Sequence, residues 1–299
     1  MKVIEYQIEA ITNLHVGSGE TNFGVVDRLV QKDAATGFPN INASSIKGAL
    51  RELFDVQVQQ SQMTVEEKNW IEVIFGSKPN DPDSREAGLF RFFDAYLLGI
   101  PVRSDKTPFL MGTCPRLIQD YIRFCRLFGR SLDEKVIATT EHLLNQIEVL
   151  NKADEERPLV FTNEYEGTLI EDFEKGAIHF QVNNEQTIAK DWLVTLLGGP
   201  VVLFADQVFM RLCDEDHLPV IARNNLTENC RNLWYEQVLP RFSRLYFFVM
   251  MPDVSKPNEK TSIGNMEFFF SNRLKKAGVV QLGANATVGY GYCTFTKKN

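Results

Sequence analysis

Two residues that could move protons, His15 and Asp27, bracket a glycine-rich loop near the start of the chain. The segment reads LHVGSGETNFGVVDRLVQKD over residues 14–33. Imidazoles and carboxylates are the usual general acids and bases of enzymes. Taken alone, a turn histidine usually makes a structural hydrogen bond, and a strand acid is usually solvated. Because His15 and Asp27 flank one loop, both are candidates for chemistry.

Two familiar nucleotide-binding loops do not fit this segment. Its glycines follow the spacing GxGxxxxG and lead into an expected strand rather than a helix, so the helix N-terminus that would hold a pyrophosphate is missing. No GK[ST] closes the loop, which excludes a P-loop. The serine-acylation motif SxxK occurs at 44–47, but its companion motifs SDN and KTG are absent from the chain. We therefore do not expect a dinucleotide-binding loop, a P-loop or serine acylation.

A basic residue, Lys47, lies in the first turn of a helix that we expect to begin at Ser44 or Ser45. Unpaired N–H groups at a helix N-terminus attract anions, and the lysine adds a full charge beside them. Arg51 follows four residues later on the same face, opposite an apolar face formed by Ile46, Leu50, Leu53 and Phe54. The segment is a candidate anion-binding site, although a solvated surface lysine explains Lys47 equally well.

Composition places the chain among ordinary globular proteins. It has 299 residues, 44% hydrophobic and 24% charged, with a formal net charge of -7. An acidic balance disfavours non-specific nucleic-acid binding but permits a local basic groove. The five cysteines form no CxxC pair, so we expect core thiols rather than a zinc site. No apolar run approaches the ~20 residues of a membrane helix, and we expect a cytoplasmic protein that contacts no membrane.

Strands and helices are expected to alternate irregularly along the chain, which favours an α+β fold over a doubly wound parallel sheet. We expect strands over 3–11, 25–30, 88–95, 201–205 and 244–250, and a strand pair within 279–295. We expect helices from Ser44 or Ser45 through Phe54, and over 65–75, 115–128, 131–149, 185–197 and 266–277. Residues 208–223 are read as a hairpin, and the acidic stretch 151–176 as an exposed insertion.

Several segments, taken in order, resemble one family. They are LHVGSGETNFGVVDRLVQKD, TGFPNINASSIKGALRELF, IFGS, AGLFRFFDAYLLGIPVRS and the closing QLGANATVGYGYCTF. Together they resemble the RAMP proteins of CRISPR systems, and most closely the repeated backbone subunit of type III-B (Cmr) effector complexes. The resemblance spans nearly the whole chain and is most specific between Gly37 and Leu53.

The resemblance implies a hand-like α+β fold, in which a ferredoxin-like, RRM-like palm carries inserted fingers and a thumb hairpin. One RAMP domain would cover residues 1–299. It would carry a helical finger insertion at about 55–150, an acidic insertion at about 151–176 and a thumb segment at about 206–240. Both 208–223 and 223–240 are candidates for the thumb itself.

The resemblance also implies an activity and partners. Copies of the chain would stack along a CRISPR guide RNA into a helical filament, together with other subunits of the type III complex. The thumb would displace one nucleotide of the guide–target duplex, and the complementary target RNA would be cut beside that gap. Sequence would be read by base pairing, so the protein would need to bind only the RNA backbone.

Individual positions follow from matching the family pattern. Asp27 matches the catalytic aspartate and would hold Mg²⁺ or another divalent metal, since hydrated Mg²⁺ needs only one or two carboxylates. His15 matches the loop histidine, and Tyr235 and Glu236 match positions near the cut phosphate. The implied RNA-binding residues are Gly17, Ser18, Gly19, Ser44, Ser45, Lys47, Arg51 and Trp234. A core position for Trp234 is an equal alternative to base stacking.

Three other functions remain open from the sequence. The chain could be an RNA-binding scaffold that does not cut, or a type III-A backbone subunit. It could also be a guide-processing endonuclease that acts without metal through His15. An Asp27→Asn variant separates the first proposal from the guide-processing enzyme, because only the former needs the carboxylate.

Overall fold

The structure, a computed structural model, describes residues 1–19, 24–60, 63–77, 87–153, 157–227, 230–252 and 263–298. The chain divides into two compact units. The first comprises Met1–Tyr96, Val220–Arg241 and Leu245–Asn299, and the second Leu97–Pro219 and Phe242–Arg244. Both contain helices and a sheet, which confirms the α+β class. The expected insertions are defined against a family pattern, so this division does not test them.

The sheet of the first unit contains the two ends of the chain side by side. Its strands run in the order β12 (Val280–Gln281), β13 (Tyr292–Lys298), β1 (Lys2–Ala10) and β11 (Arg244–Met251). β1 and β13 are antiparallel, with Tyr6 opposite Lys297. β3 (Arg91–Phe92) pairs with β11, and β2 (Asn40–Ile41) pairs with the first residues of β4 (Ala95–Val102). The expected strands over 3–11 and 244–250 are thus confirmed.

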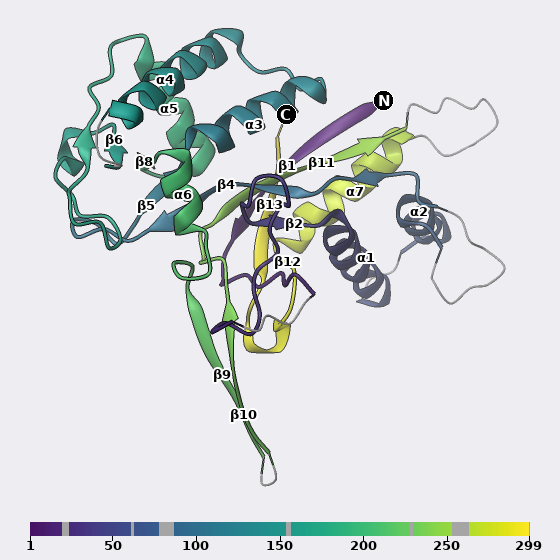
Figure 1. The fold of residues 1–299 in the computed structure, drawn as a ribbon. Coiled ribbons are helices and arrows are strands. Elements are labelled where there is room, and N and C mark those ends of the chain that lie inside the picture. The colour runs from purple at the N-terminus through teal and green to yellow at the C-terminus, as the bar shows by residue number, and fades with distance from the viewer. Residues whose placement is uncertain are drawn as a thin grey trace. The chain divides into compact units, whose positions relative to one another are not determined.

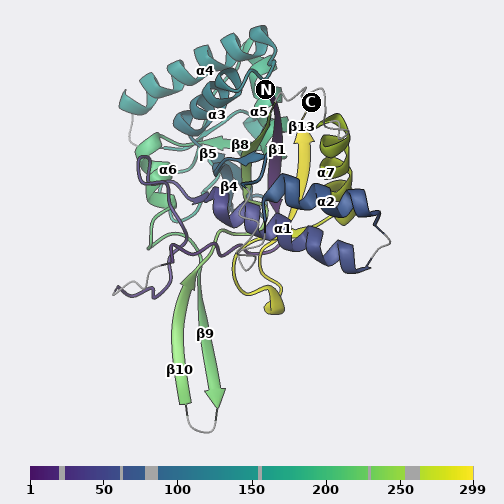
Figure 2. The same cartoon turned by 90° about the vertical axis from the view of Figure 1, so that its right-hand side faces the viewer.

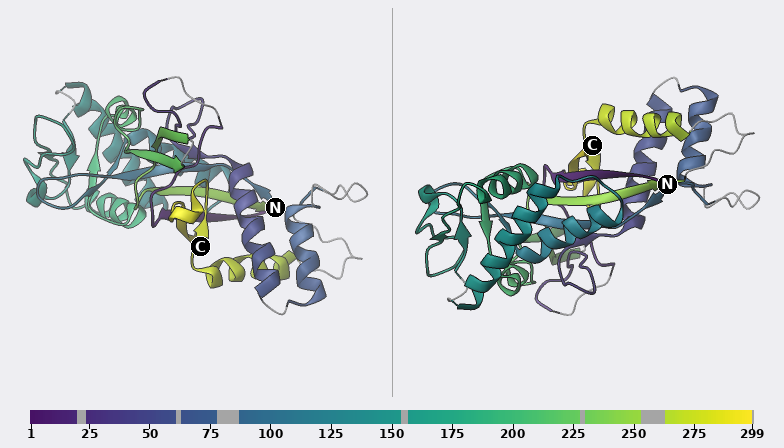
Figure 3. Two further views of the ribbon diagram at one scale, coloured as in Figure 1. Left: turned by 90° about the horizontal axis from the view of Figure 1, so that it is seen from below. Right: turned by 90° about the horizontal axis from the view of Figure 1, so that it is seen from above.

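Three helices of the first unit pack through aromatic side chains. They are α1 (Ala43–Gln60), α2 (Val65–Phe75) and α7 (Ile263–Ala277), which Figures 2 and 3 show grouped together. Phe54 of α1 stacks on Phe270 of α7 with ring centroids 5.5 Å apart, and Phe270 in turn contacts Tyr6 of β1 at 6.0 Å. These rings are buried, so the amphipathic faces of the helices cover the sheet.

A long antiparallel hairpin, β9 (Val220–Thr227) and β10 (Cys230–Gln237), extends from the first unit (Figure 1). Trp234 lies opposite Arg223, and Tyr235 opposite Ala222. The hairpin expected over 208–223 is wrong, because α6 (Asp206–Leu212) occupies the start of that range. Val208, Phe209 and Leu212 follow helical spacing and are buried, as expected for one face of a short helix.

The second unit has a mixed sheet with helices. β4 is followed in the sheet by β5 (Leu110–Thr113), β8 (Val201–Leu203), β6 (Leu159–Val160) and β7 (Ile178–His179). In addition to α6, this unit contains the helices α3 (Pro115–Leu127), α4 (Glu134–Ala153) and α5 (Gln186–Leu197). β5 and β8 are parallel, whereas β6 runs antiparallel to β8. The expected helices at 115–128, 131–149 and 185–197 are confirmed.

Four other expectations need correction. The strand expected over 25–30 is reduced to isolated bridges at Arg28 and Val30. The strand expected over 88–95 is the short β3, and the longer strand begins at Ala95. The acidic stretch is not simply exposed, because Leu159, Val160 and Ile170 are buried. Helix α1 begins at Ala43, one residue before the expected start, and Asp94 Oδ1 accepts a hydrogen bond from the Ala43 N–H at 2.7 Å.

Two compositional expectations can be compared with the structure. Cys114, Cys125, Cys213 and Cys293 are free and buried, as expected for core thiols; the side chain of Cys230 lies outside the described set. Burial raises the pKa of Cys293 to about 12, so this thiol stays protonated. Among the described residues, no helix has the length and hydropathy needed to cross a bilayer.

Candidate active site at the base of the hairpin

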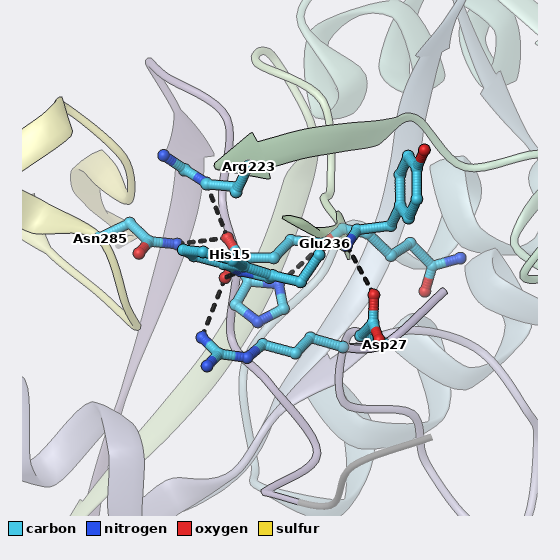
Figure 4. Close-up of polar contacts among 9 residues, drawn as sticks. His15, Asp27, Arg223, Glu236 and Asn285 are labelled. Carbon is cyan, nitrogen blue, oxygen red and sulfur yellow. Dashed lines mark hydrogen bonds and ion pairs between the residues drawn. The ribbon is translucent and has the colours of Figure 1, made fainter. Parts of the chain in front are cut away.

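Asp27 is fixed against the second strand of the hairpin. Its Oδ2 accepts a hydrogen bond from the Tyr235 N–H at 2.7 Å, and its own N–H donates to the Tyr235 carbonyl at 3.1 Å. Figure 4 shows the Asp27 side chain directed at this backbone position. The residue is half-buried. The loop after the first glycines is thereby held at the base of the hairpin, and the carboxylate has a defined direction.

Glu236 is the centre of the site and is fully buried. It lies on β10, two residues after Trp234. Its Oε1 accepts from the Trp234 indole at 2.8 Å and from Arg28 Nη1 at 3.0 Å. Its Oε2 accepts from Asn285 Nδ2 at 2.7 Å and from Arg223 Nε at 2.9 Å. Figure 4 shows these donors converging on one carboxylate. One side chain therefore joins the Asp27 loop, both strands of the hairpin and the C-terminal glycine-rich loop.

The surroundings of Glu236 favour its ionised form. Burial alone would raise the pKa of this carboxyl, and it is the largest single influence. The hydrogen bonds from Trp234 and Asn285, with the electrostatic influence of His15 and Arg223, outweigh burial and leave the pKa below its ordinary value. Glu236 is therefore a carboxylate at neutral pH, with both oxygens already engaged.

His15 is also buried, with 3% of its surface exposed. Its Nδ1 lies 2.6 Å from the Gln237 carbonyl oxygen. Because a carbonyl can only accept, Nδ1 carries the proton in this contact, which fixes the tautomer of the neutral ring. Gln237 also holds the loop after Asp27, since its Oε1 accepts from the Val30 N–H at 3.2 Å. The histidine is thus tied to the base of the hairpin.

The C-terminal glycine-rich loop is attached to the same site. The Ala284 N–H donates to the His15 carbonyl at 2.9 Å, and the Gly291 N–H to the Asn13 carbonyl at 2.8 Å. Gly283 has φ +75°, and a Cβ there would collide with the His15 carbonyl, so only glycine fits this approach. Asn285 takes the left-handed conformation, with φ 67°, and its side chain reaches Glu236.

The two neighbouring aromatic residues differ in accessibility. Trp234 is half-buried, with its indole nitrogen on Glu236 and the Arg28 guanidinium 5.6 Å from its ring centre. Tyr235 points to the other face of the strand, as alternation requires, and is 38% exposed. Tyr235 therefore presents the more accessible ring for stacking on a base.

The other residues expected to bind RNA belong to two further segments of the first unit. Gly17, Ser18 and Gly19 are exposed before the undescribed stretch 20–23. In α1, Ser44 is exposed and Ser45 and Lys47 are half-buried. Arg51 donates from Nη1 to the Gly76 carbonyl at 2.8 Å, and its side chain is 17% exposed. Arg51 is thus engaged by the protein, whereas the three loop residues face solvent.

The side chains of the site limit how it could hold a divalent metal. Within the described ranges, no cluster of three or more His, Cys, Asp or Glu side chains could hold an ion. Of the two acids, Asp27 keeps one oxygen without a partner among the described residues, whereas Glu236 has both oxygens engaged. This arrangement does not suit a metal cage made of protein ligands, but it does suit a hydrated Mg²⁺ held by one carboxylate.

The structure brings together Asp27, His15, Trp234, Tyr235 and Glu236, all expected from the sequence. It also adds Arg28, Arg223 and Asn285, which the sequence interpretation missed. Asn285 carried a readable signal, because asparagine in a glycine-containing turn tolerates the left-handed conformation. Arg28 was visible only as the neighbour of Asp27. No local pattern indicated Arg223, since its partner lies 13 residues away on the paired strand.

The sheet carries a long hairpin, with a carboxylate and a glycine-rich loop at the hairpin's base. This arrangement is found in a known class of protein. The chain belongs to the RAMP superfamily, whose family model matches residues 7–294. It is 28% identical to the CRISPR system Cmr endoribonuclease Cmr4 of Pyrococcus furiosus, over all of this chain and 96% of that protein. It is 25% identical to the CRISPR system CMR subunit Cmr4 of Saccharolobus solfataricus, over 95% of this chain and 92% of that protein.

Solved structures with the same fold include a type III-B Cmr-beta complex bound to cognate target RNA. The matching chain has a TM-score of 0.72 and 19% identity, over 99% of this chain and 97% of that one. An oligomeric Cmr4 from Pyrococcus furiosus matches with a TM-score of 0.64 and 20% identity, over 100% and 98% of the two chains. At these identities the likeness establishes the fold.

Proposed function

We propose that this chain is a backbone subunit of a type III-B CRISPR effector complex in the cytoplasm. It binds a guide RNA and the complementary target RNA, and it cuts the target at regular intervals. Full-length similarity to a Cmr endoribonuclease supports the class of activity. The observation that carries the catalytic assignment is the position of Asp27, whose carboxylate is fixed on the backbone of Tyr235 at the base of the hairpin.

The proposed reaction is an in-line phosphodiester transfer. The 2′-hydroxyl oxygen of the target attacks the adjacent phosphorus as its proton passes to Asp27 or to water. The bond to the 5′ oxygen breaks, leaving a 2′,3′-cyclic phosphate and a 5′-hydroxyl that takes a proton from water. A-form stacking opposes in-line geometry, so a hairpin that displaces one nucleotide would relieve that constraint. A hydrated Mg²⁺ on Asp27 would add positive charge beside the phosphate.

The neighbours of Asp27 would act in different ways. Tyr235 is exposed beside it and could stack on the displaced base. Glu236 has no oxygen to spare and would act by holding its donors in place. His15 would orient the strand end through the Gln237 carbonyl.

RNA-backbone contacts are assigned to the loop Gly17–Gly19 and to the start of α1. The N-terminal turn of α1 offers Ser44, Ser45 and Lys47, and helix N-termini favour phosphate. Arg51 would act less directly, because its guanidinium is engaged by the Gly76 carbonyl at the end of α2. Further copies of the chain and other subunits of the complex would complete the RNA path, in keeping with the oligomeric relative.

A non-cutting scaffold is the second candidate. It is favoured by the donor set, because the described part of the chain has no cluster of three candidate metal ligands. In this alternative the hairpin and glycine-rich loop bind RNA, and Asp27 only anchors its loop to Tyr235. The two candidates differ in one measurable property, the dependence of cleavage on the Asp27 carboxylate.

The test is cleavage of a labelled complementary RNA by the guide-loaded complex, with Mg²⁺ or EDTA, for wild type and Asp27→Asn. We expect regularly spaced, Mg²⁺-dependent cuts, and a rate loss of about 10²- to 10⁴-fold in the variant, the range for losing a general base. Asp172→Asn is the matched control, because that acid is 91% exposed in the other unit. Tight target binding without cuts in the wild type would leave the scaffold function.

A further inference from the structure

Arg28, the residue after Asp27, is held in place by the protein and yet remains open to solvent. Its N–H donates to the Tyr235 carbonyl at 3.1 Å, and its carbonyl accepts from the Gln237 N–H at 2.9 Å. At the far end of the side chain, Nη1 donates to Glu236 Oε1 at 3.0 Å. The side chain is nevertheless 55% exposed. A guanidinium has five N–H donors, so this ion pair leaves donors for another group.

Glu236 shares its single carboxylate between two arginines that differ in exposure. Glu236 carries one negative charge, and it pairs with both Arg28 and Arg223. Arg223 is 17% exposed and is stacked 4.3 Å from the Tyr290 ring centre, so it lies mostly inside the protein. Of the two arginines, Arg28 is therefore the one that presents its guanidinium to solvent. A second anion can approach it without displacing Glu236.

The geometry of Arg28 selects the kind of anion. A guanidinium is a planar fork that matches the oxygens of a phosphate or carboxylate and stays charged at any physiological pH. Here Glu236 on one side and the Trp234 ring on another restrict the fork before any ligand arrives. Less side-chain entropy is then lost when the ligand binds. A fixed, exposed guanidinium with N–H donors left over from its ion pair is a built contact for an oxyanion.

We propose that Arg28 binds a backbone phosphate of the RNA, next to the nucleotide that Asp27 addresses. The proposal rests on the proposed function, because the phosphate is identified by the RNA assigned to the neighbouring carboxylate. The competing explanation is that the Arg28–Glu236 pair only closes the base of the hairpin. A phosphate contact changes how RNA binding depends on salt, and a purely structural ion pair does not.

The experiment measures RNA affinity as a function of KCl concentration in an Asp27→Asn background, which prevents cutting. Each phosphate contact made by a cation contributes about 0.7 to the slope of log K against log salt for a single strand. We expect Arg28→Gln to reduce the slope by about 0.7. Arg28→Lys keeps the charge but loses the fork, so it should keep the slope and bind more weakly. Arg103→Gln is the control, since Arg103 is an exposed, ion-paired arginine of the second unit.

Two arms distinguish the source of the phosphate. One titrates guide RNA into the full chain, and the other titrates complementary RNA into the guide-loaded protein. A slope change in either arm supports the contact and assigns it to that strand. Unchanged slopes in both arms, or an equal change in Arg103→Gln, would overturn it while leaving RNA binding intact. No RNA binding by the parent protein would overturn the proposed function as well. Thermal unfolding of each variant identifies loss of fold, and the slope itself does not depend on the active fraction.

Discussion

Two glutamates of the first unit, Glu236 at the base of the hairpin and Glu267 on α7, each pair with two cationic side chains. Glu267 receives Lys2 Nζ at 2.5 Å and Lys297 Nζ at 3.1 Å, joining the helix to the neighbouring strands β1 and β13. For both acids burial opposes ionisation most strongly, and the donors outweigh it to leave the pKa below the ordinary value. In this respect the two regions look alike.

They differ in how far the partners are removed from water. Lys2 is 62% exposed and Lys297 37% exposed. Of the two cations on Glu236, Arg28 is 55% exposed but Arg223 only 17%, and Glu236 itself is fully buried. Glu236 also binds two neutral donors, Trp234 and Asn285. An exposed pair gains little because water and salt screen it, and a buried network depends on every partner. The burial of the partners, more than the number of cations, should therefore set the energetic weight of each carboxylate.

The first way to test this comparison is Glu236→Gln, for which we expect the largest effect. The amide keeps the shape of the side chain but replaces one accepting oxygen by a donor facing Asn285 and Arg223. We expect the free energy of unfolding to fall by about 3 kcal/mol, the lower end of the range for a broken buried pair, because Arg28 stays hydrated. Urea unfolding measures it, with exposed Glu164→Gln as control. A loss equal to that of the control would show that the cluster is not a stabilising unit.

The same pair of proteins should differ in acid. The folded-state pKa of Glu236 is lowered, so its contribution to stability is present above the unfolded value of about 4.3 and disappears as pH falls through the folded value. The difference in unfolding free energy between wild type and Glu236→Gln should therefore be constant near neutral pH and shrink below about pH 4. Urea unfolding across this range measures it. If the difference in unfolding free energy grew in acid, Glu236 would not be an ionised carboxylate that stabilises the fold.

Substitution of Asn285 removes one of the hydrogen bonds to Glu236 and leaves the others in place. Asn285→Gly keeps the left-handed backbone and loses only the bond to Glu236, for which we expect about 1.5 kcal/mol of destabilisation. Asn285→Ala also loses that bond, and alanine tolerates the left-handed backbone at φ 67° less well than asparagine or glycine. This strain should add about 1 kcal/mol to the destabilisation. The comparison of these two variants by urea unfolding separates hydrogen bond from backbone strain. Equal stabilities for alanine and glycine would mean that the loop relaxes instead of staying attached.

Much of this fold was accessible from local sequence patterns. Apolar residues at helical spacing and simple boundary signals predicted α2, α3 and α5 well, and Pro115 and Gly129 mark the limits of α3 as expected. The hairpin was misplaced because Val208, Phe209 and Leu212 suit a short helix as well as a strand. Short apolar runs do not distinguish these possibilities.

The candidate site could be predicted only in part from the sequence, for a different reason. Asp27, His15 and Glu236 could be named because a family pattern marks them. The contacts that give them roles join residues far apart in the chain, such as Asp27 with Tyr235 and Glu236 with Asn285. Whether a carboxylate is saturated or has an oxygen to spare depends on those contacts. Hence the sequence could nominate both acids, but it could not separate the one held ready for chemistry from the one that binds its neighbours.

Glu267 provides the smallest effect and completes the comparison. Its partners are lysines that keep much of their surface in water, so Glu267→Gln should lower the unfolding free energy by less than about 1 kcal/mol. The effect should shrink further in high salt, because partly exposed charges are screened, whereas that of Glu236→Gln should persist. A double-mutant cycle of Glu267→Gln with Lys297→Met, followed by urea unfolding at low and high salt, isolates the pair. A coupling energy as large and as salt-resistant as the Glu236 effect would show that the number of cations matters after all, and that burial of the partners does not distinguish the two sites.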